Sequence, residues 1–152
     1  MGKMFFPRTP VLLLDFSKSG MSVEYKDLIK GLETLPVTTL IVPPEGNSLS
    51  VHSKNVRSIA HSARSRALEA ADIIVALDGD VSGVWKNGCV PVAKFEGDST
   101  VDYNPLRQKG NGFYFKNATK WEIFAAVVRA LETYQFPYDW ENLIRGIWTM
   151  SD

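Results

Sequence analysis

The sequence predicts an α/β fold, a three-layer Rossmann-like domain with a mostly parallel sheet of about six strands. Short apolar runs alternate along the chain with segments of helical periodicity, which is typical of a parallel sheet covered by helices. The runs at 11–16 and 72–77 are apolar almost throughout, as expected of strands that are buried on both faces. We expect residues 1–10 to be an N-terminal extension and residues 11–152 to form one domain, the number that a length of 152 residues favours.

Each further element follows from its own pattern of residues. The expected strands are 11–16, 37–42, 55–60, 72–77, 90–93 and 112–115, and the expected helices are 21–32, 62–71, a short one between 77 and 90, one that begins at Thr119 and one that follows Pro137. Ser62 is a candidate N-cap for its helix, and Thr119 with Glu122 has the spacing of a capping box. Because proline cannot donate a ladder hydrogen bond, Pro91 should lie at a sheet edge or at the start of its strand.

Helical spacing also predicts which side chains of the last two helices are buried. The expected apolar faces consist of Trp121, Phe124, Ala125, Val128 and Leu131 in the first helix, and of Trp140, Leu143, Ile144 and Ile147 in the second. On these faces we expect Trp121, Trp140 and Trp148 to be core residues rather than platforms on which a sugar ring stacks.

Composition excludes several classes of function. The 17 basic and 17 acidic residues balance, which argues against a nucleic-acid binder and against an electrostatic membrane anchor. No apolar run approaches the roughly 20 residues that span a bilayer, and the first residues do not have the pattern of a signal peptide. The single cysteine, Cys89, indicates a reducing compartment, so we expect a cytoplasmic protein. We expect no metal site, since neither histidine has Cys, Asp or Glu at ligand spacing.

Three loops should meet at the carboxyl edge of the sheet, where a doubly wound fold binds its ligands. Lys18, Ser19 and Gly20 form a small polar loop that can either contact a phosphate or be a plain tight turn. The second loop, 60–64, belongs to a segment, 52–66, that holds both histidines together with Lys54, Arg57, Arg64 and Arg66. His61 is a candidate contact for a base or a phosphate, and the alternative is a solvated helix start with scattered charges.

The third loop is the segment of Asp78, Gly79, Asp80, Ser82 and Gly83, which follows the clearest buried strand. Its two carboxylates could do acid–base chemistry if their pKa values were driven apart, but aspartate and glycine are also ordinary turn residues. No Ser/His/Asp or Cys/His arrangement can be argued from spacing, and we expect no catalytic residue.

A set of segments in the C-terminal third follows the pattern of a known family: 112–115, Trp121, 126–134, 140–145 and 150–152, with fainter matches at 15–32, His61, Arg66, 71–75 and 88–92. In these segments the sequence resembles the end of bacterial glycogen synthases and plant starch synthases. The resemblance implies the donor-binding, Rossmann-like half of a two-domain retaining glycosyltransferase. The implied ligand is a nucleotide sugar, ADP-glucose or UDP-glucose, with Lys18, Ser19 and Gly20 near phosphate, His61 near the base and residues 78–83 around the sugar.

The departures from that family predict lost activity. In the family an arginine and a lysine neutralise the diphosphate, but Asp15 and Ser19 stand at their positions here. A carboxylate beside the phosphates opposes both binding and departure of the leaving group. The family's sugar-contacting glutamate has no counterpart, and the helix after the 78–83 loop is shortened. The acceptor-binding half has no counterpart in the matched pattern, so we expect a degenerate donor domain without transferase activity of its own.

Two other functions are compatible with the sequence. The first is a non-catalytic interaction or regulatory module that forms a homo-oligomer or pairs with a glycosyltransferase partner chain, which in a split enzyme would supply the acceptor half. The second is a nucleoside deoxyribosyltransferase, which the stretch 72–83 faintly resembles, although residues 84–87 lack the nucleophilic glutamate of that family.

Overall fold

Six parallel strands form one sheet in the order β3-β2-β1-β4-β5-β6 in the computed structural model, which describes residues 8–18, 23–51, 53–77 and 81–151. The strands are β1 (Val11–Asp15), β2 (Thr38–Val42), β3 (Val56–Ser58), β4 (Ile73–Ala76), β5 (Val90–Lys94) and β6 (Phe113–Phe115). The order runs outward in both directions from β1 and β4, which is the topology of a Rossmann-like sheet. The predicted fold class is confirmed, and every strand pair is parallel.

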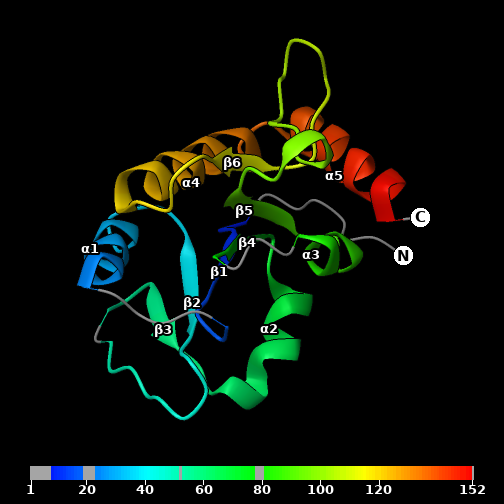
Figure 1. The fold of residues 1–152 in the computed structure, drawn as a ribbon. Helices are drawn as coiled ribbons and strands as arrows, with labels where there is room; N and C mark the ends of the chain where they lie inside the picture. The colour runs from blue at the N-terminus through cyan, green and yellow to red at the C-terminus, as the bar shows by residue number, and fades with distance from the viewer. Residues whose placement is uncertain (1–7, 19–22, 52, 78–80, 152) are drawn as a thin grey trace.

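Helices cover both faces of the sheet. They are α1 (Val23–Leu32), α2 (Arg64–Ala70), α3 (Ser82–Lys86), α4 (Lys120–Tyr134) and α5 (Pro137–Ser151), with short 3-10 turns at His61–Ala63 and Gly97–Ser99. Figure 1 shows α1 and α4 on one side of the sheet and α2 and α3 on the other. The C-terminal helix α5 packs against both α3 and α4. None of the described helices is both long enough and apolar enough to cross a membrane.

The centre of the sheet is sealed from water. Leu12, Leu13 and Leu14 of β1 have no exposed surface, and all four residues of β4 are buried. This complete burial explains why both strands are continuous apolar runs in the sequence.

The face of α4 that packs on the sheet matches the predicted one only in part: Leu131 is buried as predicted and Phe124 and Val128 are half-buried, but Trp121 and Ala125 are exposed. Its buried residues are Ile123, Ala126, Val127, Ala130, Leu131 and Tyr134. Trp121 is 73% exposed, with the Lys120 ammonium 5.3 Å from its ring centre, so its assignment to the core was wrong. Trp121 precedes Ile123 by two positions, or about 200° around the helix, and therefore points away from the sheet. Trp140 is buried as predicted, whereas Trp148 is 39% exposed.

Three local predictions about single residues are resolved by the structure. Ser62 is not the N-cap of α2, because the chain enters that helix through the 3-10 turn and Ala63 takes the cap position without a side-chain bond. Pro91 lies near the start of β5 and not at an edge, since β5 is an inner strand. The pairing of β5 with β6 begins only at Val92, so no ladder bond to β6 is lost at the proline. The predicted Thr119 cap forms, its hydroxyl accepting from the Glu122 N–H at 3.2 Å.

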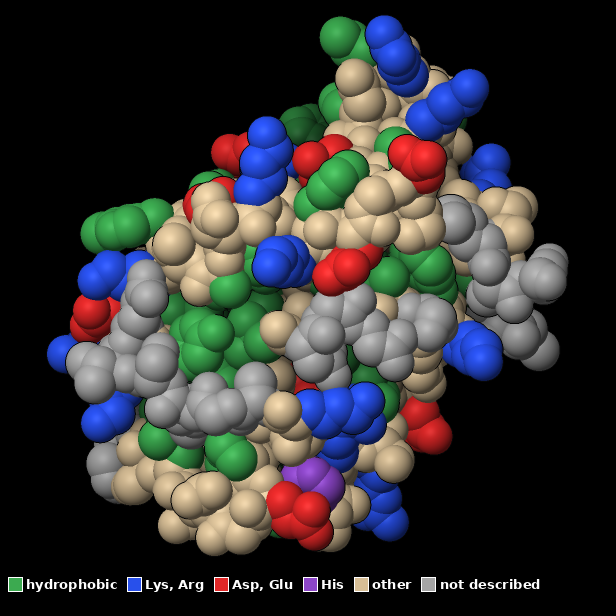
Figure 2. All heavy atoms as spheres, viewed as in Figure 1, with side chains coloured by type: hydrophobic (Ala, Val, Ile, Leu, Met, Phe, Trp, Pro, Cys, Tyr) green, Lys and Arg blue, Asp and Glu red, His purple; other side chains and the backbone are tan. Residues whose placement is uncertain are grey.

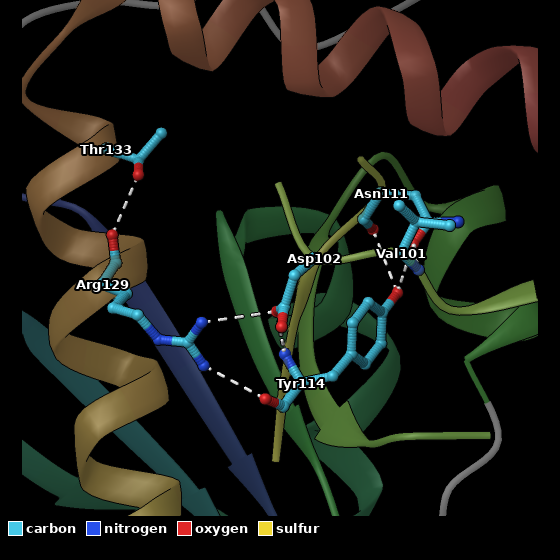
Figure 3. A network of polar contacts seen from close by, with 6 residues as sticks. All are labelled: Val101, Asp102, Asn111, Tyr114, Arg129 and Thr133. Atoms are coloured by element: carbon cyan, nitrogen blue, oxygen red, sulfur yellow. Dashed lines mark hydrogen bonds and ion pairs between the residues drawn. The ribbon is translucent and has the colours of Figure 1, made fainter. Parts of the chain in front are cut away.

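The connection between β5 and β6 projects from the sheet but is tied down by polar contacts (Figure 3). The side-chain oxygen of Asn111 accepts from the Val101 N–H at 3.0 Å and from the Tyr114 hydroxyl at 2.7 Å. Asp102 accepts from the Tyr114 N–H at 2.8 Å, and Arg129 of α4 lies 3.5 Å from the Asp102 carboxylate. Arg129 also donates to the Tyr114 carbonyl at 3.1 Å, so α4, β6 and the connection form one network.

Candidate functional site

A cavity of about 260 Å³ lies where the strand order reverses, at the carboxyl ends of β1 and β4. We call it the switch-point cavity, and it is lined by Asp15, Lys18, Arg64, Leu68, Ile74, Ala76, Gly83, Val84 and Asn87. These residues come from the ends of two strands and from α2 and α3, which cover the same face of the sheet. Open α/β sheets bind their ligands at such a reversal point.

The charged wall of the cavity is an ion pair between β1 and α2. The Arg64 Nε donates to Oδ2 of Asp15 at 2.9 Å, and the Ser17 N–H donates to Oδ1 at 2.9 Å. The Asp15 side chain is only 10% exposed and that of Arg64 is 33% exposed. Asp15 therefore holds the guanidinium group through Nε, and the two Nη groups make no hydrogen bond to any residue that the structure describes.

The rest of the lining is polar on one side and apolar on the other. Lys18 adds an ammonium group from the loop after β1. Asn87 donates its side-chain N–H to the Gly83 carbonyl at 2.9 Å, which fixes its amide at the end of α3. Leu68 and Val84 supply apolar surface. Such a cavity suits a small ligand group that has one charged or hydroxylated side.

The structure brings two of the predicted site residues together, since Lys18 and Gly83 line the same cavity. His61 is exposed in the turn before α2 and is not part of the lining. Ser82 begins α3. Ser19, Gly20, Asp78, Gly79 and Asp80 lie outside the described residues. Ligand binding by any of these residues remains a prediction.

Sequence reasoning missed Arg64 and Asn87. It placed Arg64 at the end of the 60–64 loop, among the scattered charges of the 52–66 segment, whereas the structure pairs it with the carboxylate of the last residue of β1. Asp15 is the sequence feature that could have indicated Arg64, because a carboxylate at the end of a buried strand needs a cation nearby. Figure 2 shows lysine and arginine side chains gathered near the middle of one face, beside the histidine.

No set of three or more metal-ligating side chains occurs among the described residues. The described lining of the cavity includes Lys18, Arg64 and the Asn87 amide, which are groups that recognise an anion or a sugar hydroxyl.

Comparison with known sequences gives relatives over part of the chain. No family model matches it. A glycogen synthase of Fervidobacterium nodosum is 33% identical over 67 residues, which are 42% of this chain and 14% of that protein. Glycogen synthase 1 of Synechocystis sp. is 34% identical over 59 residues, which are 37% of this chain and 12% of that protein. The matched segment is thus a small fraction of the length of these curated relatives.

Solved structures match almost the whole chain at low identity. The glycosyltransferase SnogD from Streptomyces nogalater has a TM-score of 0.60 and 12% identity, covering 97% of this chain and 42% of that one. The spinosyn forosaminyltransferase SpnP has a TM-score of 0.58 and 17% identity, covering 96% of this chain and 41% of that one. At such identities the likeness concerns the fold. This chain thus has the fold of these glycosyltransferase structures, and part of it is similar in sequence to glycogen synthases.

Proposed function

We propose that this domain binds a nucleotide sugar, ADP-glucose or UDP-glucose, at the switch-point cavity and does not transfer the sugar by itself. One observation supports the proposal most. Arg64 lines the cavity that Lys18 also lines, and it comes from an element other than the one that carries the cations in the related synthases. A guanidinium group can bind two phosphate oxygens in parallel, and an ammonium group adds a point charge beside it.

In the proposed complex the diphosphate contacts Lys18 and Arg64, with Ser19 and Gly20 in the same loop. The sugar lies toward Gly83 and the 78–83 segment, and the base extends along the surface toward His61, three positions before Arg64. The cavity of about 260 Å³ is at the small end of ligand sites, so it holds one group of the ligand while the remainder stays on the surface. We therefore expect weak binding.

Charge argues against catalysis by this chain alone. Asp15 already bonds the Arg64 guanidinium group, so the cavity offers less positive charge to a diphosphate that gains negative charge as the sugar leaves. Stabilisation of that developing charge is the largest contribution to many such reactions. An acceptor must also be held against the sugar, and a second domain would have to provide that surface.

The test is a titration with ADP-glucose and UDP-glucose, followed by amide NMR shifts. We expect saturable shifts at Lys18, Arg64 and Gly83. Arg64→Ala should weaken binding about tenfold, because it removes a charged two-point contact. Arg66→Ala is the matched control, since Arg66 lies on the same helix and outside the cavity lining. Absence of saturable shifts at millimolar ligand, or equal loss in both variants, would refute the proposal.

A second candidate is the donor half of a split or multidomain glycosyltransferase. The fold covers nearly all of this chain but only 42% and 41% of the two structural neighbours, which supports completion by another polypeptide segment. Mass measurement in solution and coexpression with neighbouring genes would test it. A stable complex that transfers glucose would show that the domain is the donor half of an active enzyme. A monomer that forms no complex would instead favour the first proposal, in which the domain binds a nucleotide sugar without transferring it.

A further inference from the structure

We propose that the free edge of β3, together with the groove beside it, binds an extended acidic segment of a partner protein as an added strand. The surface is separate from the switch-point cavity, because β2 and β1 lie between β3 and β4 in the sheet. The inference therefore stands or fails independently of nucleotide binding.

The outer edge of β3 has unused backbone hydrogen-bonding groups. β3 pairs only with β2, in the register Thr39 with Val56 and Ile41 with Ser58. The Thr39 N–H donates to the Asn55 carbonyl at 2.8 Å, and the Ile59 N–H donates to the Ile41 carbonyl at 2.9 Å. Because alternate residues of a parallel strand face the same neighbour, Val56 and Ser58 direct their N–H and C=O groups outward.

Nothing in the described part of the chain satisfies those outward groups. No described residue forms a hydrogen bond with the backbone of Val56 or Ser58 on the side away from β2. Exposed edges of this kind are templates for a further strand, and proteins commonly block them with a proline, a bulge or a covering loop. Here, within the described residues, a groove separates the edge from the chain at 49–51 and 53–54.

The groove has a volume of about 680 Å³ and runs along β3. One wall is the strand itself and the other is formed by residues 49–51, 53 and 54. The lining combines the hydroxyls of Ser53 and Ser58 with the half-buried apolar side chains of Leu49 and Val51. An extended peptide can place its backbone on the edge and alternate side chains in such a groove.

The charge of the groove indicates which kind of segment binds there. The charged groups that line the groove are Lys54 and Arg57, both exposed, and neither has a carboxylate partner among the described residues. A second copy of this chain paired edge to edge would bring the same two cations against them, which is unfavourable. Cationic edges thus discourage self-pairing while they leave the edge open to a segment of opposite charge.

The experiment uses a capped decapeptide of alternating glutamate and threonine, with an alternating lysine and threonine decapeptide as the comparison. We expect saturable binding of the acidic probe and little binding of the basic one. Hydrogen exchange followed by NMR should show slower exchange at the Val56 and Ser58 amides in the complex, because an added strand covers those N–H groups.

Three variants separate strand addition from general attraction of charges. Replacing Lys54 and Arg57 together by glutamate should weaken the acidic probe about tenfold and create binding of the basic probe. Ser58→Pro removes the outward N–H without touching the β2 ladder and should abolish protection of the remaining outward amide, that of Val56, whereas Ser58→Ala should retain it. No saturable binding of the acidic probe at millimolar concentration overturns the proposal. Binding without protection of Ser58, or equal binding of both probes, overturns it as well.

Discussion

The Arg64 Nε lies 2.9 Å from Oδ2 of Asp15, so the guanidinium group at the switch-point cavity is already bonded to an anion of the same chain. Asp15 is the last residue of β1, and Arg64 begins α2, 49 residues later. The pair fixes where the arginine points and lowers the positive charge that a ligand meets. Its removal should therefore change binding and stability in opposite directions.

Asp15→Asn tests that expectation. The amide oxygen can still accept from the Ser17 N–H, but the negative charge next to Arg64 is gone. We expect ADP-glucose to bind about threefold to tenfold more tightly, and the free energy of unfolding to fall by about 1 kcal/mol. Calorimetric titration and urea unfolding measure the two effects. Unchanged or weaker binding would mean that Asp15 does not compete with the ligand for Arg64.

Thr39→Val should stabilise the protein. Thr39 lies in β2 with no exposed surface, and its hydroxyl has no hydrogen-bond partner within the described ranges. Valine has nearly the same shape and avoids the cost of burying a hydroxyl without a partner, a gain of about 1 kcal/mol. Thr38→Val at the partly exposed neighbouring position is the control and should change stability little. A destabilised Thr39→Val protein would show that the hydroxyl does form a bond.

Stability should decline in strongly alkaline solution because of Tyr103. Burial, together with its hydrogen bond to Asp139 at 2.9 Å, raises the pKa of Tyr103 from 10.0 to about 12. Between these pH values the unfolded chain has lost the phenol proton while the folded chain retains it, so the free energy of unfolding falls as pH rises. Unfolding at pH 9 and above, compared with Tyr103→Phe, measures the effect. The variant should show a shallower decline, and identical slopes would contradict the assignment.

The tryptophans of the two C-terminal helices should differ in their contribution to stability. Trp140 is 4% exposed and packs edge-on against Tyr134, with ring centres 5.0 Å apart. Trp140→Leu leaves part of that space empty and should cost about 2–4 kcal/mol of the free energy of unfolding. Trp121→Leu changes a side chain that is 73% exposed and should cost less than about 0.5 kcal/mol. Comparable losses in urea unfolding would show that Trp121 is packed in solution.

The sheet could be predicted because strands that are buried on both faces, such as β1 and β4, are continuous apolar runs in the sequence. The face of α4 was not, because its sequence is apolar at two overlapping sets of positions, and only contact with β5 and β6 distinguishes Ile123 from Trp121. The candidate site also has one part that the sequence predicts and one part that it does not. Lys18 and Gly83 follow from strand ends, whereas the pairing of Asp15 with Arg64 depends on α2 lying beside β1, which no local pattern specifies.

The sheet centre has a consequence for synthesis on the ribosome. Leu12 pairs with Thr39 on one side and with Ile73 on the other, so one side of β1 stays uncovered until β4 has been made. During that interval a hydrophobic strand with open backbone groups is exposed in the nascent chain, and pairings of such long sequence separation form slowly. Aggregation of this protein is therefore most favoured while only β1, β2 and β3 have been made, and a chaperone would act at that stage.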